Sequence, residues 1–124
     1  MQTFITQQRR SDLTIRPDGR IDISARVARI LDMAKGDAIN IAAEQGEYYL
    51  YISHRATRHT TSRFEATVFP TNRGGNNMRT YSRRLAALVL GACGSSDTVR
   101  LFTGELISHG DTDYLTIIMY PQER

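Results

Sequence analysis

Arginine is the residue type in this chain whose number and spacing could do chemistry. It supplies fifteen of the sixteen basic residues of the 124-residue chain, which has a formal net charge of +3. Guanidinium groups make planar, paired hydrogen bonds to phosphates and base edges, whereas lysine acts as a mobile point charge. Residues 1–84 hold fourteen of the sixteen basic residues. This bias favours anion recognition, although a genome with high arginine usage would give the same composition.

Two segments of the chain follow one pattern, between Gly19 and Ile52 and between Asn77 and Ile117, and together they hold seven of the fifteen arginines. In each segment a serine is followed, at identical spacing, by three apolar residues of a helix-like stretch. These are Ser24 with Val27, Ile30 and Leu31, and Ser82 with Leu85, Leu88 and Val89. Each set is expected to be buried, and the matching order of elements predicts a two-unit internal repeat.

Turn residues and a helix-capping residue mark where the elements of the first unit begin and end. Leu13 and Ile15 indicate a strand, and Pro17–Gly19 predicts a tight turn into a second strand at Arg20–Ile23. Ser24 is a good N-cap, and the helix after it is expected to end near Lys35, with Gly36 as its stop. Arg26 and Arg29 fall outside the apolar stripe, so both are free for solvent or a partner.

The second unit is less regular. Its opening strand is expected at 66–70, followed by a loop over 71–77. Alignment with the first unit places Arg79 where an inward residue such as Ile21 is expected, and matches Tyr81 to Ile23. The last hairpin is expected to have a long loop over 108–113.

The first unit resembles the DNA-binding domain of the AbrB/MazE (SpoVT-AbrB) family, the swapped-hairpin members of the cradle-loop barrels. It departs from the family pattern at Ser24, where proline is usual, and at Asp32, where glycine is common. The residues that carry the resemblance are Gly19, Arg20, Ile21, Ile23, Val27, Ile30, Leu31, Met33, Lys35, Gly36, Asp37, Ile39 and Ile41.

The resemblance implies a fold that is mostly β with two short helices (α+β). It would form a pseudo-two-fold cradle-loop or double-psi-like barrel from two ββαβ units. The expected organisation is a single domain over 1–124, with a first unit at 13–52, a basic polar connector at 53–65 and a second unit at 66–118. Family barrels are normally built by two chains, so this chain would be a monomer with a pseudo-dimeric core or a homodimer.

The resemblance also implies DNA-binding residues and a partner, duplex DNA, with a role in transcription regulation. Arg20 matches the arginine after the motif glycine, and Arg29 matches a basic helix position. Arg26 is this chain's own addition, Arg84 aligns with it, and Arg83 stands beside Arg84. Further phosphate contacts are assigned to Arg16, Arg55 and Arg58. For each arginine the alternative is a solvated surface position.

Other classes find little support in the sequence. No histidine pair has metal spacing and no nucleophile elbow exists, so no enzyme activity, catalytic residue, metal or cofactor is expected. The single cysteine, Cys93, and the lack of a signal peptide or a long apolar run predict a cytoplasmic protein without a membrane span. The alternative function is a protein-interaction module without nucleic-acid binding, in which a polypeptide partner binds the barrel surface, an exposed sheet edge, or the cluster of Tyr48, Tyr49 and Tyr51.

Overall fold

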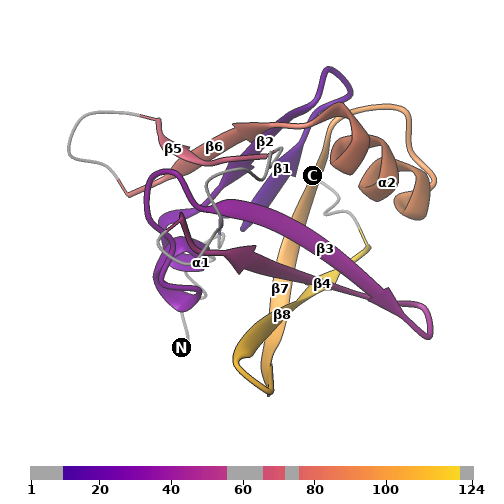
Figure 1. Ribbon diagram of the computed structural model, residues 1–124. Coiled ribbons are helices and arrows are strands. Elements are labelled where there is room, and N and C mark those ends of the chain that lie inside the picture. Colours follow the sequence, from indigo (N-terminus) through magenta and orange to yellow (C-terminus); the bar gives the residue numbers. More distant parts are fainter. Residues whose placement is uncertain (1–9, 56–65, 72–75, 121–124) are drawn as a thin grey trace, which may run out of the picture.

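The computed structural model describes residues 10–55, 66–71 and 76–120 of the chain. In these ranges eight strands form one antiparallel sheet that curls into a half-barrel, accompanied by two helices (Figure 1). A mostly β chain with two helices is therefore confirmed. The elements are β1 (Leu13–Ile15), β2 (Arg20–Ile23), α1 (Ala25–Ile30), β3 (Ala38–Glu44), β4 (Glu47–Ser53), β5 (Phe69–Pro70), β6 (Met78–Tyr81), α2 (Arg83–Cys93), β7 (Val99–His109) and β8 (Thr112–Ile118).

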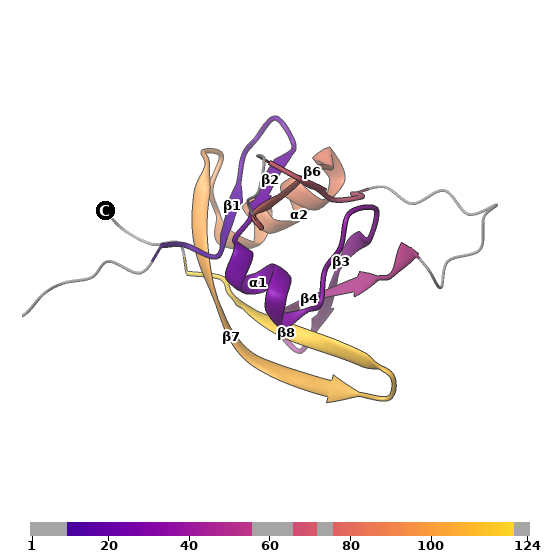
Figure 2. The ribbon, with the colours of Figure 1, turned by 90° about the vertical axis from the view of Figure 1, so that its left-hand side faces the viewer.

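The sheet order is β3-β4-β8-β7-β1-β2-β6-β5, so pairs of strands from the first and the second half of the chain alternate in it. Figure 2 shows the β7–β8 hairpin curving beneath α1 and the β1–β2 hairpin above. The core draws on both halves of the chain. Its fully buried members include Ile15, Ile21, Ile23, Val27, Ile39, Leu50, Val89, Leu101 and Leu115. No helix in the described ranges is long and apolar enough to cross a membrane.

The β1–β2 hairpin forms as its turn residues predict. Gly19 has a φ of 103°, which only glycine adopts without strain, and its N–H donates to the Arg16 carbonyl at 3.0 Å. A Cβ on Gly19 would lie 3.0 Å from Cγ of Arg83, so the turn also packs closely on the start of α2. This turn therefore couples the hairpin to the second helix.

Helix α1 is shorter than expected. Ser24 caps it by accepting the Val27 N–H at 3.2 Å, but the helix ends at Ile30 and not near Lys35. Asp32 adopts a left-handed φ of 53°, and the Met33 N–H then donates to the Ala28 carbonyl at 2.8 Å. This is the Schellman arrangement, which terminates a helix and usually requires glycine at the left-handed position.

Helix α2 is capped in the same way, since Ser82 accepts the Leu85 N–H at 3.1 Å and Gly94 closes the helix with a φ of 69°. Its buried stripe consists of Leu85, Ala86, Val89 and Leu90. Leu88 is 38% exposed, so its predicted burial is wrong, and Ile30 in α1 is only half-buried. At about 100° per residue, Leu88 lies roughly 130° around the helix from the centre of that stripe, outside it.

Strand β6 corrects the expected alignment of the second unit. Met78 and Thr80 are buried and pair with Ile23 and Ile21 of β2. Because side chains alternate along a strand, Arg79 and Tyr81 face outward, and Tyr81 is 55% exposed. The expectation that Arg79 faces inward is therefore wrong. The inward positions of this strand are one residue away, at Met78 and Thr80.

Two long hairpins complete the sheet. β3 and β4 meet at Gln45–Gly46, and β7 and β8 meet at Gly110–Asp111. The loop expected over 108–113 is thus only two residues long. The hairpins join through β4 and β8, where Leu50 pairs with Leu115, and they cross in Figure 1. A β-bulge interrupts the pairing of β7 with β8 between Thr103 and Leu106.

Buried Asp37 ties β3 to the end of β4. Its carboxylate accepts the backbone N–H groups of Ala34 and Arg55, each at 2.8 Å, and lies 3.1 Å from Nδ1 of His54. The connector expected at 53–65 begins here, although Ser53 still belongs to β4. Residues 56–65 lie outside the described ranges.

Candidate nucleic-acid interface

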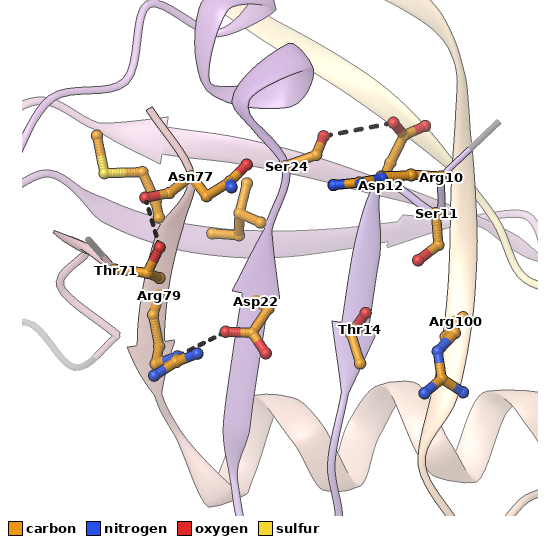
Figure 3. Close-up of a pocket in the computed structure, with 12 residues that line it drawn as sticks. Arg10, Ser11, Asp12, Thr14, Asp22, Ser24, Thr71, Asn77, Arg79 and Arg100 are labelled. Atoms are coloured by element: carbon orange, nitrogen blue, oxygen red, sulfur yellow. Dashed lines mark hydrogen bonds and ion pairs between the residues drawn. The ribbon is translucent and has the colours of Figure 1, made fainter. Parts of the chain in front are cut away.

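One row of outward side chains crosses five neighbouring strands of the sheet. Cross-strand pairing places Phe69 of β5 next to Arg79 of β6, Arg79 next to Asp22 of β2, Asp22 next to Thr14 of β1, and Thr14 next to Arg100 of β7. Figure 3 shows Arg79 and Arg100 on opposite sides of Asp22 and Thr14. Residues up to 86 positions apart in the chain, Thr14 and Arg100, thus share one surface.

A second row follows at the next outward position of each strand. Arg20 of β2 lies opposite Tyr81 of β6, and the Arg16 N–H donates to the Arg20 carbonyl at 2.9 Å. We call Arg16, Arg20, Arg79 and Arg100 the arginine face. At about 4.8 Å per strand, the three steps from β6 to β7 separate Arg79 from Arg100 by about 14 Å along the sheet.

Asp22 organises two of these arginines. Its carboxylate accepts Nε of Arg79 at 2.6 Å and Nε of Arg20 at 3.0 Å. The hydrogen bond to Asp22, together with the negative charge of that carboxylate, raises the pKa of the Arg79 guanidinium against the opposing effect of burial. One carboxylate therefore orients two guanidinium groups and leaves the trio with a net positive charge.

The arginine face borders a polar hollow of about 490 Å³. Arg10, Arg79 and Arg100 supply its cations, and Asp12 and Asp22 its carboxylates. Ser11, Ser24, Thr14, Thr71 and Asn77 add hydroxyl and amide groups, and Ile23 and Met78 add apolar ones. Figure 3 shows the labelled side chains spread across the sheet, so the hollow is broad and can receive an extended anion.

The sequence suggested that Arg26 is free for solvent or a partner, but the structure gives its guanidinium group two partners. Its Nη1 lies 3.2 Å from Oδ2 of Asp12 and 3.3 Å from Oγ1 of Thr103. The Asp12 side chain is 2% exposed and also accepts the Thr103 N–H at 2.8 Å and its hydroxyl at 2.9 Å. This network ties the start of β1 to α1 and β7, so the structure gives Arg26 a supporting role in the fold.

The other predicted arginines are dispersed. Arg29 on α1 and Arg83 and Arg84 at the start of α2 are exposed, and Arg83 packs on Gly19 beside the arginine face. Arg55 is exposed, and its side chain lies over Gly36. Arg58 lies outside the described ranges. Of the arginines predicted to bind DNA, the sheet therefore places two, Arg16 and Arg20, on the arginine face.

No protein-family model, curated protein or solved structure matches this chain. The case for a function therefore rests on the geometry of the molecule itself.

Arg79 and Arg100 are the members of the arginine face that the sequence did not predict. Arg100 stands between Val99 and Leu101, two buried residues, so strict alternation identifies it as outward. Arg79 stands in the same way between Met78 and Thr80. Alternation within each strand was the usable signal, and the repeat alignment obscured it at β6.

The described residues contain no group of three or more histidine, cysteine or acidic side chains placed to hold a metal ion. The lone thiol, Cys93, lies on α2 and packs partly buried against the core. Burial raises its pKa. It therefore carries less nucleophilic thiolate than a free cysteine at the same pH.

The raised pKa of Cys93 predicts that its thiol reacts slowly. At pH 8 the native protein is expected to react with Ellman's reagent more slowly than free cysteine does, because fewer of its thiols are ionised and access is restricted. The rate should keep rising above the pH at which free cysteine levels off, and unfolding in urea should remove the difference. A native rate equal to that of free cysteine would contradict the burial of this thiol.

Proposed function

We propose that this protein binds duplex DNA through the arginine face, as an AbrB-like DNA-binding protein that acts in transcription regulation. The observation that carries the proposal is the placement of four arginines on one face of the sheet, with Arg16 directly after β1 and the others, Arg20, Arg79 and Arg100, on β2, β6 and β7. Among the residues that the structure describes, two acidic side chains form ion pairs with them: Asp18, 3.7 Å from Arg16, and Asp22, which pairs with Arg20 and Arg79. Arginines outnumber these acids two to one, so the face is positively charged.

The spacing of the face suits a duplex. Arg79 and Arg100 stand about 14 Å apart along the sheet, close to the width of the major groove of B-DNA, which is about 12 Å. Guanidinium groups at that separation can contact phosphates on both sides of a groove. Such contacts fix position without reading sequence, and Thr14 and Asn77 in the hollow between them supply neutral polar groups.

The aromatic edge of the face adds a second kind of contact. Phe69 and Tyr81 stack with ring centroids 6.2 Å apart and an angle of 21° between the rings, and both are exposed. They flank Arg79, which pairs with Phe69 across the strands. Exposed aromatic rings beside arginines are typical of surfaces that stack on the bases of single strands, so this edge suits a duplex end or an opened base pair.

We further propose that the two halves of the chain are copies of one unit, arranged as a pseudo-two-fold barrel of the cradle-loop type. In support, strand, strand, helix, strand, strand occurs twice in order, and each helix starts with a serine cap. β2 pairs with β6, and β4 with β8, so corresponding strands of the two halves are neighbours. One chain would then supply what two chains supply in family barrels.

A titration tests the DNA proposal directly. Anisotropy of a labelled mixed-sequence duplex would be followed at about 50 and 200 mM salt. Four phosphate contacts predict that the association constant falls about a hundredfold between these conditions. Absence of binding at the lower salt concentration, or binding that does not depend on salt, would contradict the proposal.

A further inference from the structure

Three tyrosines form a cluster on the outward face of the two long hairpins. The ring of Tyr114 on β8 lies 6.3 Å from that of Tyr49 and 5.1 Å from that of Tyr51, both on β4. Leu50 and Leu115, the neighbours of these tyrosines in sequence, are buried. Because side chains alternate, the tyrosines face away from the core.

The cluster borders a second hollow, of about 420 Å³, separate from the arginine face. Tyr49 and Tyr114 line it together with apolar Ala42 and Ile107, and Glu44 and His109 add polar groups. Ile107 is 40% exposed. The hollow therefore combines aromatic rings, an aliphatic wall and a carboxylate.

The charge around this hollow is of one sign. Residues 38–53 and 101–120, which contain both hairpins except Val99 and Arg100 at the start of β7, hold five acidic residues and no lysine or arginine. The acidic side chains, all exposed, are Glu44, Glu47, Glu105, Asp111 and Asp113. Tyrosine rings attract cations to their faces, and these two segments contain no lysine or arginine to occupy them. The surface is complementary to a cation and repels phosphate.

The backbone beside the hollow is also available. Within the described residues, β7 beyond the bulge pairs with β8 alone, and Asn40–Glu44 of β3 pairs with β4 alone. Both strands thus have an unpaired edge next to the tyrosines. Extended polypeptides dock on such edges through main-chain hydrogen bonds, with side chains entering adjacent pockets.

We infer that the hairpin face is a docking site for an extended basic polypeptide, and that the hollow takes one of its arginine or lysine side chains. The cation stacks on Tyr49 and Tyr114 while Glu44 accepts its N–H groups. This partner is distinct from DNA and binds a different face of the molecule. The inference therefore does not depend on the DNA proposal.

A labelled peptide of alternating arginine and serine serves as the probe, with binding followed by anisotropy. Joint replacement Tyr49→Leu and Tyr114→Leu keeps apolar side chains but removes both rings, and should weaken binding about five- to thirtyfold. Glu44→Gln with Glu47→Gln, at exposed positions that tolerate change, should weaken binding about two- to fivefold and reduce its salt dependence. The control Tyr120→Leu, at a tyrosine 84% exposed beyond β8, should leave affinity within about twofold of the parent.

Circular dichroism would establish that each variant is folded, and the double tyrosine variant should bind duplex DNA as the parent does. Equal affinity of the parent and the folded tyrosine variant for the peptide would overturn the inference. So would equal binding of a peptide with glutamate in place of arginine. If the protein alone self-associates and amide signals of Tyr114 and Ile107 shift with its concentration, the occupant is a second copy of the chain and not a basic partner.

Discussion

Joint replacement of Arg16, Arg79 and Arg100 by glutamine is expected to lower the affinity for duplex DNA by about two to three orders of magnitude at 50 mM salt. Each lost phosphate contact reduces the slope of log K against log salt by about 0.9, so three contacts reduce it by nearly three. The variant is expected to remain folded, because Nε of Arg20 still pairs with the Asp22 carboxylate at 3.0 Å. Titrations at several salt concentrations measure both quantities.

A matched variant separates the arginine face from net charge. Arg29, Lys35 and Arg55 are exposed and lie on α1, in the loop after it and just beyond β4. Their joint replacement by glutamine removes the same charge away from the face, and a less than tenfold loss of affinity is expected. If this variant loses as much affinity as the first, the interface lies on the α1 side and the proposed face is wrong.

Asp12→Ala is expected to reduce the free energy of unfolding by about 3–5 kcal/mol. The Asp12 side chain is 2% exposed and accepts the N–H and hydroxyl of buried Thr103 at 2.8 and 2.9 Å. Its removal leaves these donors and the Arg26 guanidinium without their acceptor. Urea unfolding followed by circular dichroism gives the change from the midpoint and slope.

Two further variants check that the effect arises from the network. Asp12→Asn keeps an acceptor oxygen but loses the charge, so a loss of about 1–2 kcal/mol is expected. Asp97→Ala removes an exposed carboxylate and should change stability by less than about 0.5 kcal/mol. A loss from Asp12→Ala no larger than that from Asp97→Ala would show that the carboxylate does not hold β1, α1 and β7 together.

The sequence predicted local structure well where short-range chemistry decides it. The turn at Gly19 and the caps at Ser24 and Ser82 form as expected, because each depends on contacts within a few residues. The end of α1 was wrong because Asp32 takes a conformation that glycine usually supplies. The available signals were that glycine is common at this position in the family pattern and that aspartate adopts the left-handed conformation more readily than most residues.

The candidate site was predicted only in part, because it is made by pairing of distant strands. Arg20 and Arg16 come from one hairpin and were identified, but Arg79 and Arg100 join them only through β6 and β7. The ion pair between Arg26 and Asp12 likewise depends on a buried carboxylate 14 residues away in the chain. Such partners are fixed by tertiary packing, which helix periodicity alone does not contain.

The bulge in β7 has a consequence for how the molecule stays separate from its copies. An eleven-residue strand with an open edge is a template for edge-to-edge aggregation. Between Thr103 and Leu106 the ladder is interrupted, and the intervening residues are Gly104 and the exposed charge of Glu105. A bulge twists a strand locally, and a charged residue at that point repels an identical edge. The same irregularity that bends the hairpin thus protects it from forming continuous intermolecular sheets.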